Sequence, residues 1–321
     1  MMLEAKELTL CARQDIYPVW KLDLQLGREE RLAVVGESGG GKTSLAWALM
    51  GRPLPGQSVL TGGVYLDGMN LYDLSSRERA GLYYRRMALV PQNAQNSFHP
   101  TQRLWESARE VMQRVEEDGR GTRLSGKGVQ EALAEASGLL DLDPSLWAGY
   151  PHQLSGGQKQ RMALILALLK PPEVLLMDEP THALDELTRA RMMIFLEARM
   201  EKAGGSVVLF THDVGMAEEW AHRTAVLYRG EIVEEIPGAA FGKATHPYTR
   251  ALMHAAVRLG DAPLSRCGVP GHALPLAGMP AGCGFFERCE QAVGKCREAR
   301  PRLLGRGSHK VRCFYSEGNG I

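Results

Sequence analysis

The apolar and polar pattern near the start of the chain predicts a strand, a glycine-rich loop and a helix in direct succession. Apolar and polar residues alternate over much of 3–10, and positions 30–35 end in a continuous apolar run, as is typical of strands. Glycines crowd the segment after the second of these, and positions 43–50 then follow a helical pattern. We therefore expect a tight loop that joins the end of a strand to the first turn of a helix.

Two later apolar runs predict a parallel sheet. Residues 174–177 and 206–210 lack the two-residue alternation of half-exposed strands, as expected for strands that are buried on both faces. A helical pattern over 187–202 separates them. The order strand, helix, strand favours an α/β fold with a doubly wound parallel sheet.

The pattern changes twice along the chain. Residues 101–150 are typical of helices around a glycine-rich stretch at 118–128, which predicts a helical subdomain over about 94–154. After about residue 240, frequent Pro and Gly replace the periodic pattern. We expect a core domain over 1–240 and a loop-rich extension over 241–321.

Composition adds few constraints beyond a folded chain. The 321 residues are 44% hydrophobic and 23% charged, which is ordinary for a globular protein. The longest uninterrupted apolar run covers residues 162–169, far short of the roughly 18 to 20 that a membrane-spanning helix needs. Glu4 and Glu7 stand where a secretory signal would have its apolar stretch. These features predict a cytosolic chain whose membrane role, if it has one, depends on partners.

The C-terminal 79 residues have an unusual charge and cysteine content. Residues 243–321 hold twelve Lys and Arg against five acids, a balance of +7 within a total of +1. Such a segment is a solvated surface, a membrane-adjacent surface or, least favoured because no aromatic array accompanies it, a nucleic-acid surface. Five of the six cysteines also lie here, four of them within 283–313, which in a cytosolic chain indicates metal or redox chemistry before disulfides.

The glycine-rich loop matches the phosphate-binding pattern G-x-x-x-x-G-K-[ST]. It lies between a predicted strand and a predicted helix, as that pattern requires. Its backbone N–H groups would surround a phosphate at the positive end of the helix, Lys42 would reach the β and γ phosphates, and Thr43 would bind Mg²⁺. The predicted ATP-binding residues are Gly36, Glu37, Ser38, Gly39, Gly40, Gly41, Lys42, Thr43 and Ser44.

Acidic residues follow the apolar run at 174–177. Asp178 is placed to hold Mg²⁺, and Glu179 is then the candidate that orients and polarises the attacking water. The alternative is that the two acids only cap a helix. His212 follows the second apolar run, where a lone histidine is more often just a polar strand end than a contact for the γ phosphate.

The segment Leu154-Ser155-Gly156-Gly157-Gln158 resembles the LSGGQ signature of the ABC ATPases. Four further motifs match that family in order and spacing: the loop at 36–43, Gln92 as the Q-loop, Asp185 as the D-loop and His212 as the switch histidine. The resemblance implies a P-loop NTPase core with an antiparallel β subdomain and a helical subdomain. It also implies that Thr43, Gln92 and Asp178 hold Mg²⁺.

The family resemblance further implies a head-to-tail pair of ATPase units. The signature residues Ser155, Gly156, Gly157 and Gln158 of one unit would then close the ATP site of the other, because a helix N-terminus with small residues approaches the γ phosphate closely. Two positions depart from the family pattern. His182 replaces the usual Ser or Thr, and Tyr17 is only an approximate match for the aromatic that stacks on adenine.

Several segments resemble the oligopeptide/dipeptide/nickel importer ATPases in particular, above all the run His246-Pro247-Tyr248-Thr249-Arg250-Ala251-Leu252. This resemblance implies uptake of peptides, nickel or a similar small solute. It also implies a peripheral position on the cytoplasmic face of the membrane. The implied partners are two permeases, an extracytoplasmic solute-binding protein and a second ATPase chain, which in this subfamily is more often a different chain, giving a heterodimer, than a copy of the first. No nucleic-acid partner is expected. The rival interpretation is a soluble ABC ATPase of translation or DNA repair.

The four tail cysteines Cys283, Cys289, Cys296 and Cys313 are close enough in sequence to surround one ion or cluster. They lack the paired C-x₂-C spacing that is usual for structural zinc. Four cysteines on irregular loops suit a 4Fe–4S cluster, and some members of the resembled subfamily have one. Zinc and reduced thiols remain the alternatives.

Overall fold

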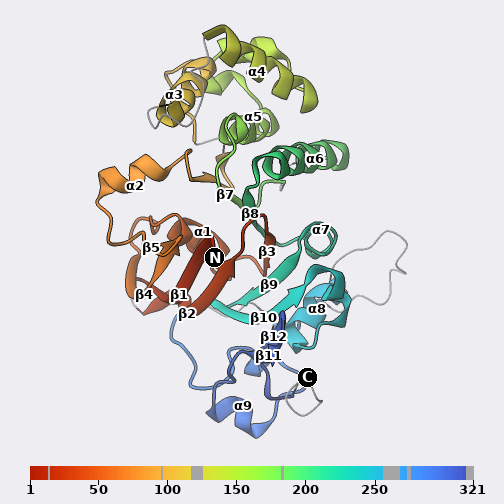
Figure 1. Ribbon diagram of the computed structural model, residues 1–321. Helices are drawn as coiled ribbons and strands as arrows, with labels where there is room; N and C mark the ends of the chain where they lie inside the picture. Colours follow the sequence, from red (N-terminus) through yellow and green to blue (C-terminus); the bar gives the residue numbers. More distant parts are fainter. Residues whose placement is uncertain are drawn as a thin grey trace. The chain divides into compact units, whose positions relative to one another are not determined.

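The computed structural model describes residues 1–13, 15–94, 97–116, 126–181, 184–255, 268–272 and 276–315. Most of the glycine-rich stretch at 118–128, together with His182 and Cys267, lies outside the described residues. The chain forms two compact units (Figure 1). The first contains 1–26, 30–72 and 208–321, and the second contains 27–29 and 73–207. Within the described residues, no helix has the length and apolarity needed to cross a membrane.

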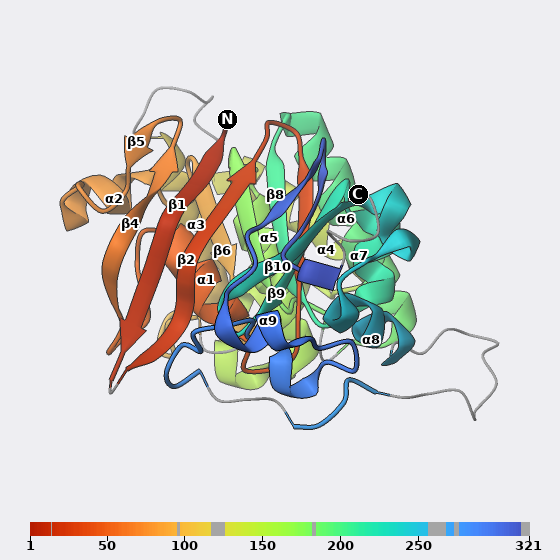
Figure 2. The same ribbon diagram turned by 90° about the horizontal axis from the view of Figure 1, so that it is seen from below.

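An antiparallel sheet in the first unit confirms the predicted β subdomain. Its strand order is β2-β1-β4-β5, formed by β1 (Leu3–Ala12), β2 (Ile16–Leu26), β4 (Ser58–Leu66) and β5 (Met69–Asn70). Leu3 is paired with Leu26 on one side and with Leu66 on the other, and all three side chains are buried. Figure 2 shows β1, β2 and β4 side by side. Alternating buried leucines in β2 hold this face together.

A second sheet in this unit has the order β11-β12-β10-β9-β3-β8. Its strands are β3 (Arg31–Val35), β8 (Ser206–Thr211, in this unit from Val208 on), β9 (Arg223–Tyr228), β10 (Glu231–Pro237), β11 (Leu304–Arg306) and β12 (His309–Val311). β3 and β9 are parallel, and both are buried almost throughout, as the continuous apolar runs predict. The helices of the unit are α1 (Lys42–Leu49), α7 (Val214–Trp220), α8 (Pro247–Ala255) and the short α9 (Gly294–Glu298).

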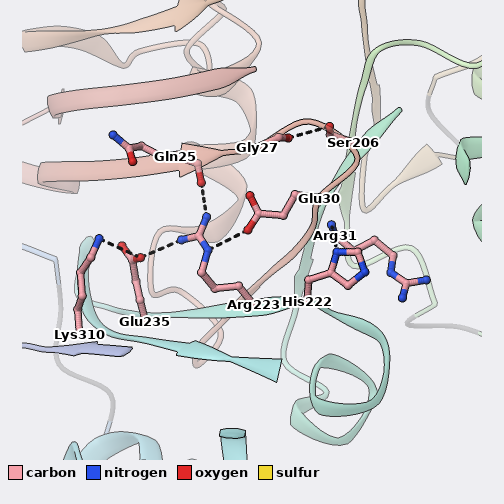
Figure 3. A network of polar contacts seen from close by, with 9 residues as sticks. All are labelled: Gln25, Gly27, Glu30, Arg31, Ser206, His222, Arg223, Glu235 and Lys310. Atoms are coloured by element: carbon pink, nitrogen blue, oxygen red, sulfur yellow. Dashed lines mark hydrogen bonds and ion pairs between the residues drawn. The ribbon is translucent and has the colours of Figure 1, made fainter. Parts of the chain in front are cut away.

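The C-terminal extension contributes strands to this sheet. Strand β12 pairs with β10 in antiparallel fashion, so that Lys310 lies opposite Glu235. Arg223 connects the region further: its guanidinium donates to Glu30 (2.9 Å) and to Glu235 (2.8 Å), and Lys310 lies 3.5 Å from the same Glu235 carboxylate (Figure 3). The extension therefore shares one folded body with the strand that leads into the glycine-rich loop.

The second unit contains the predicted helical subdomain. Its helices are α2 (Ser76–Leu82), α3 (Leu104–Glu116), α4 (Gly126–Leu139), α5 (Gly156–Leu168) and α6 (Glu186–Ala203). A parallel pair of strands, β6 (Met87–Val90) and β7 (Val174–Asp178), packs with α5. The buried indole of Trp147 donates a hydrogen bond to Ser137 Oγ (2.8 Å), which satisfies the polar atoms inside the helical cluster.

Candidate nucleotide-binding site

The glycine-rich loop closes tightly onto neighbouring backbone. Gly39 and Gly41 adopt positive φ angles of 78° and 105°, which favour glycine. A Cβ atom at Gly36 would lie 2.3 Å from the Leu227 carbonyl oxygen, and one at Gly41 would lie 2.1 Å from that of Pro18. The loop therefore needs glycine for two reasons: neighbouring backbone leaves no room for a Cβ at Gly36 and Gly41, and Gly39 and Gly41 have positive φ angles.

Lys42 is the first residue of α1, and its side chain lies inside the loop. Its Nζ donates to the carbonyl oxygens of Gly36 (2.8 Å) and Glu37 (3.1 Å), and the residue is 5% exposed. Thr43 follows in the first turn of α1, half-buried, and Ser44 is buried and accepts a hydrogen bond from Gln57. The ammonium group is thus held at the centre of the loop, where the helix N-terminus adds positive potential.

Tyr17 lies next to the segment that contacts the loop. The carbonyl oxygen of the following residue, Pro18, is the atom that approaches Gly41. The half-buried Tyr17 ring packs edge-on against Trp20, with the ring centroids 4.7 Å apart. The structure therefore brings Tyr17 close to the loop in the fold, and its adenine contact stays a prediction.

His212 belongs to the same unit. It directly follows β8, which neighbours β3 in the sheet, and its side chain is exposed. The strand that ends at the histidine therefore runs beside the strand that leads into the glycine-rich loop.

In the second unit, Gln92, Asp178 and Glu179 lie at the same end of two adjacent strands. Val90 of β6 is paired with Met177 of β7 in parallel register, so Gln92 and Asp178 follow the same ends of adjacent strands. Asp178 is 1% exposed and Glu179 is 8% exposed, whereas Gln92 is exposed. Glu179 has a φ of 46°, a strained conformation for a residue other than glycine. Backbone strain at this point is consistent with a functional rather than a capping carboxylate.

The signature segment is an exposed helix N-terminus. Ser155 caps α5 reciprocally with Gln158: the Ser155 N–H donates to Gln158 Oε1 (2.8 Å), and the Gln158 N–H donates to Ser155 Oγ (3.2 Å). Gly156 is exposed and Gly157 is half-exposed. A Cβ at Gly157 would lie 3.5 Å from Leu184 Cδ2, so the signature and the Asp185 segment lie together within this unit.

Asp185 caps α6. Its carboxylate accepts hydrogen bonds from the Thr188 hydroxyl (2.7 Å) and backbone N–H (2.9 Å), and these bonds lower the pKa of Asp185. Asp185 is therefore the N-cap of α6 in this structure, and its role between subunits stays a prediction.

Two residues that contact the loop were not predicted from the sequence. The Tyr248 hydroxyl accepts a hydrogen bond from the Glu37 N–H (2.9 Å), and the Arg288 guanidinium donates to both oxygens of the Glu37 carboxylate (2.6 and 2.9 Å). Tyr248 belongs to the segment that resembles the importer subfamily, but nothing in that segment indicates what the ring contacts. Arg288 lies 251 residues from its partner, so no local pattern reveals the pair.

Two of the tail cysteines, Cys283 and Cys289, have raised thiol pKa values. Burial raises the pKa of the Cys283 thiol to about 11, and negative charge on Cys296, Cys313 and Cys289 adds to the increase. The pKa of Cys289 is raised by burial in the same way, with contributions from Cys313 and Cys296. In the part of the chain that the structure describes, no group of three or more His, Cys, Asp or Glu residues is arranged to hold a metal ion.

Comparison with known proteins extends these observations over most of the chain. Residues 19–182 match the family model described as ABC transporter, and residues 233–296 match the model described as Oligopeptide/dipeptide transporter, C-terminal region. A dipeptide transport ATP-binding protein of Caldanaerobacter subterraneus subsp. tengcongensis is 35% identical over 90% of this chain and 88% of the relative. An oligopeptide transport ATP-binding protein of Salmonella typhimurium is 31% identical over 89% of this chain and 84% of the relative.

Solved structures show the same core fold. A dimeric ATP-binding cassette in a post-hydrolysis state, bound to ADP and Pi, superposes with a TM-score of 0.65 and 27% identity. The superposition covers 74% of this chain and 98% of the cassette.

Proposed function

Because this chain belongs to the ABC transporter family, we propose that it is the ATP-hydrolysing subunit of an importer that takes up peptides. ATP binding and hydrolysis are the activity of this family. The observation that carries the assignment to a peptide importer is the match of residues 233–296 to the C-terminal region of oligopeptide and dipeptide transporters. The names of its relatives favour dipeptides and oligopeptides over nickel as the solute.

Each part of the candidate site has a distinct task in this proposal. The loop around Lys42 binds the phosphates, and Tyr17 packs against the adenine. Thr43, Gln92 and Asp178 would hold Mg²⁺, and the bound ion would supply positive charge beside the transferred phosphoryl group. Glu179 orients the attacking water, and His212 contacts the γ phosphate. Burial of Asp178 and Glu179 supports these roles, because a low local dielectric strengthens their effect on a nearby cation or water.

The signature residues act on a second subunit in this proposal. Ser155, Gly156, Gly157 and Gln158 stand at an exposed helix N-terminus and so remain accessible to the nucleotide of a partner. Asp185, beside them, lies in the same contact. ATP then joins two ATPase subunits, and its hydrolysis releases them.

The remaining partners follow from the same proposal. The importer contains two permeases, a second and different ATPase, and an extracytoplasmic solute-binding protein. The chain described above sits peripherally on the cytoplasmic face of the membrane. The basic extension, with its balance of +7, is the part best suited to lie near anionic lipid headgroups.

Co-purification tests this assembly. A tagged chain is purified from detergent-solubilised membranes of its own host, and the associated proteins are identified by mass spectrometry. We expect two permeases and one further ATPase. Recovery of ribosomal or DNA-repair proteins from the soluble fraction instead would replace the importer with the rival interpretation.

We also propose that Cys283, Cys289, Cys296 and Cys313 ligate a 4Fe–4S cluster. The spacing of these cysteines lacks the paired C-x₂-C knuckles that are usual for structural zinc. In a cubane cluster each thiolate binds a different iron, so the sulfur atoms stay farther apart. The Cys283 N–H donates to the Cys296 carbonyl oxygen (2.8 Å), which places these two cysteines side by side and supports the proposal.

Metal analysis after anaerobic purification tests the cluster. We expect about four iron and four acid-labile sulfide per chain, together with a broad visible absorption that is bleached by a reductant. A Cys289→Ser variant should lose most of the iron, whereas Cys11→Ser, which alters a cysteine of β1, should keep it. Stoichiometric zinc, or a folded protein with neither iron nor sulfide, would contradict the proposal.

A further inference from the structure

Glu37 is a junction between the phosphate-binding loop and the C-terminal extension. Its carbonyl oxygen accepts hydrogen bonds from Lys42 Nζ (3.1 Å) and from the Gly40 N–H (3.1 Å). Its own N–H donates to the Tyr248 hydroxyl, and its carboxylate receives two hydrogen bonds from Arg288. Glu37 therefore contacts the phosphate-binding lysine through its backbone and the C-terminal extension through both its backbone and its side chain.

Several contacts hold the Arg288 guanidinium in place, and this restrains the Glu37 carboxylate that it binds. Its side chain is 3% exposed, against 24% for Glu37. Its Nε donates to the Pro270 carbonyl, and its guanidinium lies over the rings of Tyr228 and Phe285, 5.8 and 5.7 Å from their centroids. A planar guanidinium that is stacked and bidentate has one geometry available to it, unlike an exposed ion pair between flexible side chains.

The backbone that carries Arg288 is part of the cysteine segment. Arg288 ends the short helical turn Phe286–Arg288, which lies between Cys283 and Cys289. The Cys283 N–H donates to the Cys296 carbonyl (2.8 Å), and the Phe286 N–H donates to the Cys283 carbonyl (3.1 Å). The fold of the cysteine segment therefore determines where the guanidinium stands.

Tyr248 is the second support. It is fully buried in α8, and its ring lies 4.5 Å from that of Tyr228 and 5.4 Å from that of Phe285, measured between centroids. Its backbone N–H donates to His246 Nδ1 (3.1 Å), and the His246 N–H donates to the buried Glu234 (3.1 Å). The packing of the Tyr248 ring against Tyr228 and Phe285 thus fixes the position of the hydroxyl that accepts a hydrogen bond from the Glu37 N–H.

We propose that Arg288 and Tyr248 are positioning residues of the nucleotide site, through which the C-terminal extension sets the affinity for ATP. A phosphate-binding loop acts through backbone groups that converge before the ligand arrives, and ordering them on binding would weaken affinity. Arg288 and Tyr248 restrain Glu37 from two directions, and Glu37 in turn bonds Lys42. This inference rests on the nucleotide site of the proposed function and is independent of the solute.

The test compares Arg288→Gln with Arg300→Ala in the full chain. Arg300 is a matched control, because it joins the same extension to Glu231 of β10 (3.3 Å) without touching the loop. We expect Arg288→Gln to raise the Kd for MgATP about tenfold and to raise KM more than it lowers kcat. Arg300→Ala should leave the Kd within about twofold, even where both variants lower Tm.

Further variants keep the inference testable if Arg288→Gln folds poorly. Arg288→Lys should recover part of the affinity, since it keeps the charge and loses the second hydrogen bond. Tyr248→Phe, which removes only the hydroxyl, should raise the Kd in the same direction. In a double-mutant cycle of Arg288→Gln and Glu37→Gln, the combined effect on the Kd for MgATP should be smaller than the sum of the two single effects.

Three outcomes would overturn the inference: an unchanged Kd in folded Arg288→Gln, an equal increase in Arg300→Ala, or additive effects in the cycle. A wild-type chain that bound no MgATP would instead remove the nucleotide site itself. The two failures are therefore distinguishable in one series of titrations.

Discussion

Replacing Glu179 with glutamine is expected to reduce ATP turnover by at least about a hundredfold, within the range of 10² to 10⁴ that a positioned acid–base group supplies. The buried carboxylate follows Asp178 at the end of β7, where it can accept a proton or orient a water; an amide of the same shape keeps the packing but not that function. ATP still binds, because the phosphate contacts of the loop are unchanged. Steady-state phosphate release measures the loss.

The same variant should accumulate as an ATP-bound dimer, visible as an earlier peak in size-exclusion chromatography with MgATP. Glu186→Gln is the matched control, because Glu186 is an exposed carboxylate in the first turn of α6 and pairs only locally with Arg189. The control should hydrolyse ATP at the wild-type rate. Turnover in Glu179→Gln within a few-fold of wild type would remove Glu179 from its catalytic role.

Replacing Lys42 with alanine is expected to weaken MgATP binding by about a hundredfold or more. Truncating one partner of a desolvated, hydrogen-bonded charge pair costs about 2 to 5 kcal/mol, and about 2.7 kcal/mol corresponds to a hundredfold. Lys42 is the buried cation of the loop, and its two bonds to the carbonyl oxygens of Gly36 and Glu37 place the ammonium before any ligand arrives. Calorimetric titration with MgATP measures the change in Kd.

Lys6→Ala serves as the control for this prediction. Lys6 is an exposed lysine of the same unit, in β1, and its ion pair with Glu4 is at the surface. The control should bind MgATP with wild-type affinity, since a surface ion pair contributes little to the fold. Equal affinity of Lys42→Ala and wild type would show that the loop does not bind the phosphates.

The elements closest to the nucleotide loop were predictable because their signals are local. The helix expected over 43–50 begins at Lys42 and ends at Leu49, and the one expected over 187–202 is α6, Glu186–Ala203. Strands β7 and β8 match the two continuous apolar runs to within one residue. Glycine spacing and buried apolar runs are properties of neighbouring residues, so the sequence alone displays them.

Other elements were missed for different reasons. Strand β2 alternates buried leucines with exposed polar residues from Leu22 to Leu26, but this alternation covers only its second half. Helix α8 begins with a proline at its first position, a common start signal, inside a stretch interpreted as loops. The strands β11 and β12 are three residues each, too short for any periodicity.

The motif residues of the candidate site were predictable from the sequence, but the residues that contact Glu37 were not. Lys42, Asp178 and Glu179 were named from motifs, since the chemistry of phosphate binding requires those residue types at those spacings. The contacts of Glu37 with Tyr248 and Arg288 depend on how distant segments pack, and pairs so far apart in sequence leave no pattern along it.

The most direct test of the central claim is peptide uptake by the host. Uptake of a labelled dipeptide and a labelled oligopeptide is measured in cells that lack this chain and in the same cells after complementation. We expect uptake of at least one peptide to fall to background, to return with the wild-type chain and not to return with Glu179→Gln. Unchanged uptake of both peptides in cells that lack the chain would contradict the proposed function.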